Sequence, residues 1–481
     1  MHEAQGHHAP QSALGPLGLP AVRRTADGER RATGQRPRVL FLSCHLPWPP
    51  LSGGRRRELE LLRRVARRFD VDLLVVSKTP AQDLANRDRL RRYCRSVEVF
   101  PAADASSSGR QQRPAPPAPA GGRTAGAAIR GQTPWQVLRH RSPAATARVR
   151  EILAAGQTEL IHVEGYYLMQ HLPEPSPVPV LLVEQNVEYQ LERQMELERQ
   201  TQLGHPDQPR LTAERRRPRT DAAPPTPAQI TEEVERACWR RATRLAAVTG
   251  EDARTMRLHG APAPVAVVPD GADHIPRLHM VRGTLPRPAA PLLVLVANFG
   301  YAPNVDAALH LCREILPAIR RQVGELALWL VGTSPPPEVR ALADETVLVT
   351  GPVADVVPYL DAADVIVCPL RIGGGIKVKM LEALRRGKAI VTSSVGAQGL
   401  PPAARRAIVI ADDPQQFAHR TSALLQAPQE RAALGQRAAH AARQLPTWEE
   451  AARRLTALYD ELLGRRATGW GAASAAVGAA L

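Results

Sequence analysis

Residues 369–384 read P-L-R-I-G-G-G-I-K-V-K-M-L-E-A-L and follow the apolar run at 365–367. The pattern predicts a buried strand, a glycine turn and then a helix over about 375–386. Glycines at such a turn expose backbone N–H groups at the amino end of the helix, where the helix dipole attracts anions. The stretch therefore predicts a strand–turn–helix unit that binds an anion.

The charged side chains of this stretch sharpen the prediction. Lys377 and Lys379 are two of the four lysines in the chain. Glu382 lies about two helical turns beyond Gly375, where its carboxylate could accept both hydroxyls of a ribose while the turn holds a diphosphate. The alternative interpretation is a flexible turn with solvated lysines and a surface glutamate.

Short apolar runs alternate with amphipathic stretches on both sides of this unit, which is typical of parallel sheets covered by helices. In the second half, the expected strands are 292–296, 327–331, 347–349, 365–367, 389–392 and 408–410. In the first half, they are 39–42, 71–76, 160–163, 180–183 and 245–248. The fold class expected is α/β, with two doubly wound Rossmann-like domains facing across a cleft.

Composition shifts divide the chain further. We expect a disordered tail at 1–36 and a first domain at 37–275, which contains two flexible insertions at 103–130 and 201–228. A linker at 276–291 leads to a second domain at 292–464, and a low-complexity tail follows at 465–481. The last helix, 447–463, is expected near the domain junction, and packing within one domain is equally compatible.

Length, charge and cysteine content exclude several classes of protein. The chain has 481 residues, 44% of them apolar, without a run long enough for a membrane span or a signal peptide. A cytoplasmic protein is expected. The five cysteines are scattered, so neither a disulfide framework nor a metal site is predicted. The net charge of +16 comes almost entirely from arginine and only 4% of residues are aromatic, so no nucleic-acid partner is predicted.

Further candidate residues follow two other sets of strands. Gly53 and Gly54 come after the first strand, where a backbone could approach a phosphate or a sugar. Neither a dinucleotide fingerprint nor a P-loop is present. Glu164, Glu184 and Asn186 stand just past later strands, where polar groups could orient hydroxyls. Their alternative role is hydrogen bonding and capping within loops.

The order of motifs resembles the family 4 retaining glycosyltransferases of GT-B fold, and in particular their triple-glycine subgroup. The motifs are L-F-L-S at 40, H-V-E-G at 162, N-V-E-Y at 186, V-V-P-D-G-A-D at 267, P-N-V-D at 303, G-P-V-A-D-V-V-P-Y-L at 351, the glycine stretch, and S-V-G-A-Q-G-L at 394. The resemblance extends from residue 37 to about 463.

This resemblance implies transfer of a sugar from a nucleoside-diphosphate sugar, with retention of configuration and no required metal or other cofactor. The second domain would hold the donor and the first the acceptor. By position, Glu382 would bind the donor ribose. The diphosphate would meet the glycine turn and its basic side chains, which are also the catalytic candidates: Gly373, Gly374, Gly375, Lys377, Lys379 and Arg371. The facing loops would contribute Gly53, Gly54, Phe299 and Asn304, and the acceptor side Glu164, Glu184 and Asn186.

Two departures leave the donor open. Many members carry a glutamate at the position of Gly374, and a histidine is frequent at that of Gln185. Without an assignable pair of carboxylates, a front-face departure of the diphosphate is favoured over double displacement.

The functions compatible with these features form a short series. The first is a glycosyltransferase of cell-surface polysaccharide, glycolipid or natural-product glycoside synthesis, acting on a carbohydrate, lipid-linked or small-molecule acceptor. The alternatives are an epimerase-like enzyme and a non-catalytic nucleotide-sugar-binding subunit. Arginine-rich segments at 55–68 and 87–95 further suggest attachment to the anionic inner face of a membrane, with solvated surface arginines as the alternative.

Overall fold

The computed structural model describes residues 36–103, 132–203, 224–262, 264–276 and 285–464. Within them, seven parallel strands form the sheet of the first domain, in the order β3-β2-β1-β4-β5-β6-β7. The strands are β1 (Arg38–Ser43), β2 (Asp70–Ser77), β3 (Ser96–Pro101), β4 (Leu160–Glu164), β5 (Val180–Glu184), β6 (Arg244–Ala247) and β7 (Val265–Val267). β1 is an interior strand, with Val39 beside Val71 of β2 and Leu160 of β4.

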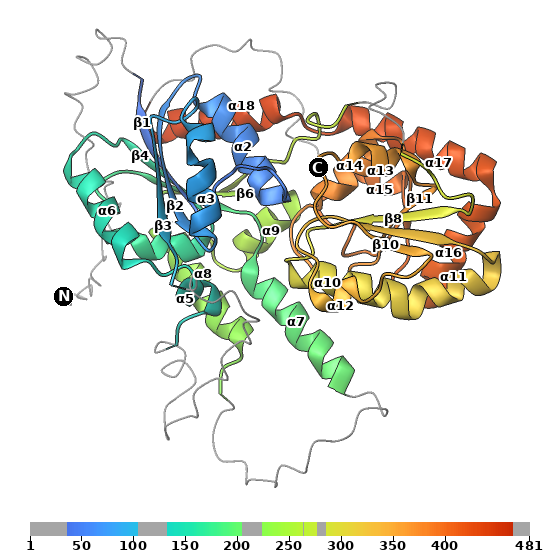
Figure 1. Ribbon diagram of the computed structural model, residues 1–481. Helices are drawn as coiled ribbons and strands as arrows, with labels where there is room; N and C mark the ends of the chain where they lie inside the picture. Colours follow the sequence, from blue (N-terminus) through green and yellow to red (C-terminus); the bar gives the residue numbers. More distant parts are fainter. Residues whose placement is uncertain (1–35, 104–131, 204–223, 263, 277–284, 465–481) are drawn as a thin grey trace, which may run out of the picture.

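Helices cover both faces of this sheet (Figure 1). They are α2 (Gly53–Val65), α3 (Pro80–Asn86), η1 (Arg87–Leu90), α5 (Trp135–Arg139), α6 (Pro143–Ala154), η2 (Tyr166–His171), α7 (Glu188–Leu203), α8 (Pro227–Arg241) and α9 (Gly250–Leu258). Because both faces are covered, the central strands are continuous apolar runs rather than alternating ones, and Val39, Leu40 and Phe41 are fully buried.

The second domain repeats this arrangement with six parallel strands among the described residues, in the order β10-β9-β8-β11-β12-β13. The strands are β8 (Leu292–Val296), β9 (Ala327–Val331), β10 (Val347–Val349), β11 (Val365–Cys368), β12 (Ala389–Thr392) and β13 (Val409–Ile410). The helical segments are α10 (Ala302–His310), η3 (Leu311–Ile315), α11 (Leu316–Val323), α12 (Pro337–Arg340), α13 (Val357–Ala362), α14 (Val378–Arg385), α15 (Pro402–Arg406), α16 (Pro414–Gln426), α17 (Pro428–Ala441) and η4 (Ala442–Gln444). The expected α/β class with two doubly wound domains is confirmed.

The last helix, α18 (Trp448–Leu462), returns to the first domain and lies beside α2 (Figure 1). Its residues Trp448, Leu455 and Tyr459 are fully buried in the same core cluster as Val39 and Phe41 of β1. The Tyr459 hydroxyl also lies 2.7 Å from Nδ1 of His162 on β4. The sequence division placed this helix in the second domain, whereas its side chains complete the core of the first.

Several expectations differ in detail from the structure. Strands β3 and β7 and helix α7 were not expected. Most of the proposed tails and of the two insertions, and half of the linker, lie outside the described residues. Within the second insertion, α7 extends to Leu203 and α8 begins at Pro227. In the described part of the chain, no helix combines the length and hydrophobicity needed to cross a bilayer.

Candidate active site

A cavity of about 510 Å³ lies between the two domains. The first domain contributes the β1–α2 loop, the β5–α7 loop and the segment after β7. The second contributes the β8–α10 loop, the β10–α13 loop and the glycine turn between β11 and α14. Loops at the carboxyl ends of both sheets therefore meet at one site, as expected for ligand binding in doubly wound folds.

The glycine turn is pressed against the first domain. A Cβ atom at Gly374 would lie 3.1 Å from Oδ1 of Asn186, and one at Gly375 would lie 2.6 Å from the carbonyl oxygen of Gln185. Gly375 also has a φ of +60°, which favours glycine. Asn186 thus occupies the space that a glutamate at position 374 would need, which gives a physical reason for the departure noted in the sequence.

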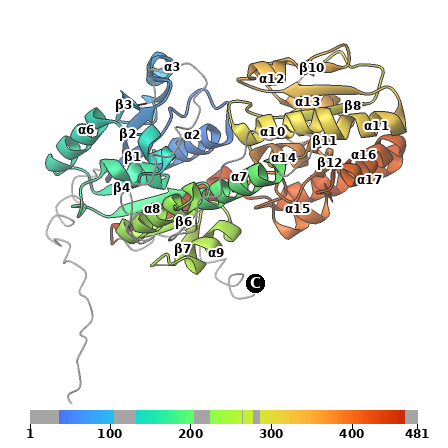
Figure 2. The same ribbon diagram turned by 90° about the horizontal axis from the view of Figure 1, so that it is seen from below.

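Helix α7 links the glycine turn to the first domain (Figure 2). The N–H of Gly373 donates to Oε1 of Gln194, at 2.9 Å. Arg371 pairs with Glu198 of the same helix, at 2.8 Å, and with Asp306 of α10. The Arg371 guanidinium is therefore engaged by two carboxylates and does not line the cavity.

The two lysines of the stretch have different surroundings. The Lys379 ammonium donates to Oδ1 of Asn304, at 2.7 Å, and both residues line the cavity. The Lys377 ammonium donates to the carbonyl oxygens of Gly374 and Gly375 and to Oε1 of Gln398, at 2.9–3.1 Å. Burial lowers the pKa of Lys379, and it lowers the pKa of Lys377 to about 8. Both lysines thus line the cavity, but the Lys377 ammonium is held by the turn itself and the Lys379 ammonium by Asn304.

Glu382 lines the cavity and is the last of three side chains that contact one another, Trp448, His274 and Glu382. Nε1 of Trp448 donates to Nδ1 of His274, at 3.1 Å, so the other ring nitrogen of His274 carries the proton. That nitrogen, Nε2, lies 3.1 Å from Oε1 of Glu382. Glu382, the candidate ribose-binding carboxylate of the second domain, is thus oriented by His274 directly. Trp448 of α18, the helix that packs on the first domain, holds His274 in turn.

A buried ion pair lies in the cavity wall. Nη1 of Arg57 is 2.7 Å from Oδ1 of Asp270, and their side chains are 2% and 6% exposed. Nε and Nη2 of Arg57 have no hydrogen-bond partner among the described residues. Arg57 therefore lines the cavity with a side chain that keeps two buried donors without a partner in the described residues.

The remaining candidates separate into lining and interior residues. Gly53 and Gly54 line the cavity, and a Cβ atom at Gly53 would lie 3.1 Å from Val378 of the other domain. Asn186 lines it as well. Phe299 instead lies in the core of the second domain, 1% exposed.

Glu164 and Glu184 are interior residues, each 1% exposed. Glu164 lies 2.9 Å from His162 and accepts a hydrogen bond from Gln185, and Glu184 accepts hydrogen bonds from the Trp239 indole and the backbone N–H of Tyr166. Burial raises the pKa of Glu184 well above its ordinary value. Glu164 and Glu184 therefore take the alternative role given in the sequence analysis, which is hydrogen bonding within the protein.

Sequence reasoning missed Arg57, Asp270 and His274. Asp270 lies in the motif V-V-P-D-G-A-D and His274 follows that motif directly. Nothing in this local sequence shows that Asp270 pairs with a residue of α2 or that His274 contacts Glu382. In the described residues, no group of three or more potential metal ligands is present.

Comparisons with known proteins agree with this geometry. Residues 290–427, from just before β8 to the end of α16, match the family described as Glycosyl transferases group 1. The sucrose-phosphate synthase of Thermosynechococcus elongatus superposes with a TM-score of 0.62 at 16% identity, over 89% of this chain and 100% of that one. The chain has the GT-B fold.

Other GT-B structures are similar at lower scores. The HepE protein of Anabaena, solved with UDP and glucose, has a TM-score of 0.56 at 13% identity, over 89% of this chain and 100% of that one. A putative UDP-N-acetylglucosamine 2-epimerase from Listeria monocytogenes has a TM-score of 0.52 at 11% identity, over 89% and 96%. Among curated proteins, no sequence match is found.

Proposed function

We propose that this chain is a glycosyltransferase that moves a sugar from a nucleoside-diphosphate sugar to an acceptor hydroxyl, with retention of configuration. The observation that carries this proposal is the lining of one interdomain cavity by the glycine turn, Lys379 and Glu382. Part of the family match covers all three. The GT-B neighbour that was solved with UDP and glucose supports the same donor class.

In the proposed complex, the donor lies against the second domain. The Glu382 carboxylate, held by His274, accepts hydrogen bonds from the ribose hydroxyls. The diphosphate lies at the amino end of α14, where the helix dipole and Lys379 favour negative charge. Asn304 holds the Lys379 ammonium in place before the donor arrives.

The chemistry then depends on position and electrostatics. As the bond between the sugar and the diphosphate breaks, negative charge grows on the leaving phosphate, and Lys379 stabilises it. The acceptor hydroxyl, held by the first domain near Asn186, attacks from the face that the phosphate leaves, and its proton passes to the departing phosphate oxygen. No step in this proposal needs a metal ion, and activity that survives a chelator is expected.

The alternatives predict different products. An epimerase-like enzyme, as one GT-B neighbour is described, would convert a nucleoside-diphosphate sugar without any acceptor. A non-catalytic subunit would bind the nucleotide sugar and release neither a new sugar nucleotide nor a glycoside.

Membrane attachment receives less support from the structure. Arg64 and Arg67 of the arginine-rich segment pair with Glu449 of α18, and Arg68 pairs with Asp460. Arg63 pairs with Glu60 of its own helix. Arg64 joins α2 to α18, and Arg67 and Arg68 join the segment after α2 to it, so we do not include a membrane in the proposed function.

The proposal is tested with purified protein and a panel of nucleoside-diphosphate sugars. A donor at 100 times its dissociation constant is expected to stabilise the fold by about 2.7 kcal/mol, which a thermal shift detects. NMR of the products with and without candidate acceptors then separates a retained glycoside from an epimerised donor. A panel in which no nucleotide sugar raises the melting temperature would contradict the proposal.

Glu382→Gln is expected to weaken donor binding by about 1.5 to 3 kcal/mol, because a charged hydrogen bond to the ribose diol is lost. Calorimetric titration of the best donor measures the change, with the melting temperature of the ligand-free protein as the control for folding. Unchanged donor affinity would remove Glu382 from the site.

Lys379→Met and Lys377→Met are expected to affect different quantities. Lys379→Met should lower turnover by about tenfold or more, because the leaving phosphate loses its cation. Lys377→Met should instead lower the melting temperature, because two carbonyl oxygens of the turn lose a charged donor. Initial rates and thermal melts are measured for both variants. Equal effects on turnover would contradict the separate roles.

A further inference from the structure

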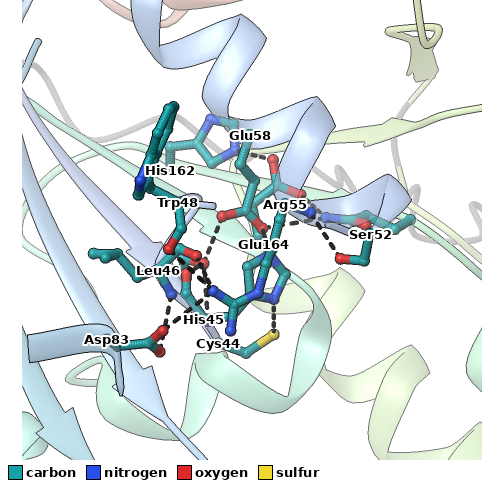
Figure 3. A network of polar contacts seen from close by, with 12 residues as sticks. Cys44, His45, Leu46, Trp48, Ser52, Arg55, Glu58, Asp83, His162 and Glu164 are labelled. Carbon is teal, nitrogen blue, oxygen red and sulfur yellow. Dashed lines mark hydrogen bonds and ion pairs between the residues drawn. The ribbon is translucent and has the colours of Figure 1, made fainter. Parts of the chain in front are cut away.

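A cysteine, a histidine and a glutamate form a contiguous polar cluster at the carboxyl end of β1 (Figure 3). Cys44 and His45 follow the strand directly, and Glu58 faces them from α2. Nδ1 of His45 is 3.3 Å from Sγ of Cys44, and Nε2 is 3.1 Å from Oε1 of Glu58. Cys44, a potential nucleophile, thus contacts the base His45, and His45 contacts Glu58, which can orient it.

The glutamate is fixed before it meets the histidine. Its side chain is fully buried, and Oε2 accepts a hydrogen bond from the Ser43 hydroxyl at 2.6 Å. The other oxygen, Oε1, lies 3.1 Å from Nε2 of His45, which is an ion-pair distance without hydrogen-bond geometry, and this contact favours a positive charge on the imidazole. Nδ1 is then the atom that shares a proton with the cysteine sulfur.

Other groups around the sulfur also favour negative charge. The Tyr167 hydroxyl donates to Sγ, at 3.4 Å, and its ring stacks on that of His140 with 4.3 Å between centroids. His140 is 1% exposed, and its Nε2 has no hydrogen-bond partner in the described part of the chain. The surroundings of the sulfur therefore consist of a hydroxyl donor, an imidazole held by a carboxylate and a second buried imidazole.

We propose that Cys44 is a thiolate paired with the His45 imidazolium and is a modification site for soft electrophiles and peroxides. With a haloacetamide, the sulfur forms a bond to carbon and the halide leaves. With hydrogen peroxide, the sulfur takes one oxygen atom to become a sulfenic acid, and hydroxide leaves as the peroxide is reduced by two electrons. The proton of the thiol already resides on His45 in this state.

The electrostatics of the cluster agree with its geometry. Burial alone would lower the pKa of His45, but Glu58 and the Cys44 sulfur raise it to about 10. Burial alone would raise the pKa of Cys44, but His45, with His140 and Lys78 nearby, holds it well below its ordinary value. Glu188 and Glu58 also face Cys44, and their negative charges oppose this effect, although burial raises the pKa of Glu188 to about 7.

Three other cysteines provide internal controls. Burial raises the pKa of Cys94 and of Cys238 to about 12, and that of Cys312 to about 11. Cys312 is also more exposed than Cys44. If access alone decided the rate, Cys312 would react before Cys44, so the two cysteines separate thiolate character from exposure.

Modification of Cys44 could affect the interdomain cavity through His45 and Gly54. His45 lies under Gly54, where a Cβ atom would be 3.3 Å from Cε1 of the imidazole, and Gly54 lines the cavity. Because His45 lies between the sulfur and this turn's contacts, we expect a group added to the sulfur to disturb the packing of His45 against Gly54. We expect the adduct to weaken nucleotide-sugar binding, an effect that rests on the proposed function, whereas the reactivity itself does not.

The reactivity is tested on the native full-length protein with short pulses of iodoacetamide between pH 6 and pH 9, followed by peptide mass spectrometry. At pH 6.5, Cys44 is expected to react at least about tenfold faster than Cys312. The Cys44 rate should change little over this range, while the Cys312 rate should rise about tenfold per pH unit. A Cys44 rate that is lower than that of Cys312, or that rises with the same slope, would overturn the proposal.

Two variants test the cluster. His45→Gln and Glu58→Gln should each slow Cys44 alkylation at pH 6.5 by about tenfold or more and leave the Cys312 rate unchanged. Because Glu58 is buried, His45→Gln provides the result if the other variant fails to fold. Unchanged Cys44 rates in a folded variant would contradict the ion pair. Donor titration of the alkylated protein then tests the route to the cavity separately.

Discussion

Replacing Arg57 by Met is expected to lower the free energy of unfolding by about 3 to 5 kcal/mol, because Asp270 is left as an unpaired charge in the interior. The Asp270 carboxyl is buried, and burial raises its pKa even with Arg57 beside it. Removing the guanidinium therefore leaves a carboxyl that must either stay charged without a partner or take up a proton.

Equilibrium urea unfolding followed by circular dichroism measures this loss. The matched control is the double variant Arg57→Met with Asp270→Leu, which removes both charges and should recover most of the stability, since buried pairs are often replaceable by apolar groups. An Arg57→Met variant as stable as the double variant would show that the unpaired Asp270 carboxyl is not the cause of the loss.

Replacing Trp448 by Ala is expected to cost about 3 to 5 kcal/mol of stability, because a fully buried indole is removed from the first domain's core. The same substitution removes the hydrogen bond that fixes the proton on His274, so Glu382 loses its orientation. Donor affinity should therefore fall together with the unfolding midpoint.

Trp448→Phe separates these two effects. A phenyl ring keeps most of the buried bulk but has no N–H, so stability should fall less than in the Ala variant while donor affinity still decreases. Urea unfolding and calorimetric titration are measured on the same preparations. If the Phe variant binds the donor as tightly as the unchanged protein, the Trp448–His274 hydrogen bond does not contribute to donor binding.

Long, continuous apolar strands were predictable because two helical layers bury both their faces. The edge strands were harder. β3 reads S-V-E-V-F-P, with charged and polar residues between apolar ones, and β7 has only three residues. Helix α7 has few apolar residues, and Gln194 and Glu198 make their contacts with the other domain. Its stability depends on tertiary contacts that a local pattern does not contain.

The candidate site divides in the same way. The glycine turn, Lys379 and Glu382 belong to one continuous stretch with a chemical pattern of its own. Arg57 and Asp270 are 213 positions apart, and His274 and Trp448 are 174 apart, so only the fold brings them together. The arginine-rich segment 55–68 also illustrates the limit, because its sequence predicts a charged surface, whereas Arg64, Arg67 and Arg68 pair with carboxylates of α18.

The return of α18 to the first domain means that the chain passes between the domains twice, at adjacent points. The N–H of Ala272 donates to the carbonyl of Pro446, and the N–H of Trp448 donates to Asp273, so the two strands of chain are tied together where they cross. Two tied crossings at one point favour rotation of the domains about that point over sliding. Nε1 of Trp448 donates to Nδ1 of His274 at this crossing, and His274 contacts Glu382, so we expect this contact to move little in such a rotation. In the proposed complex, the ribose of the donor would therefore be bound next to the point about which the domains turn.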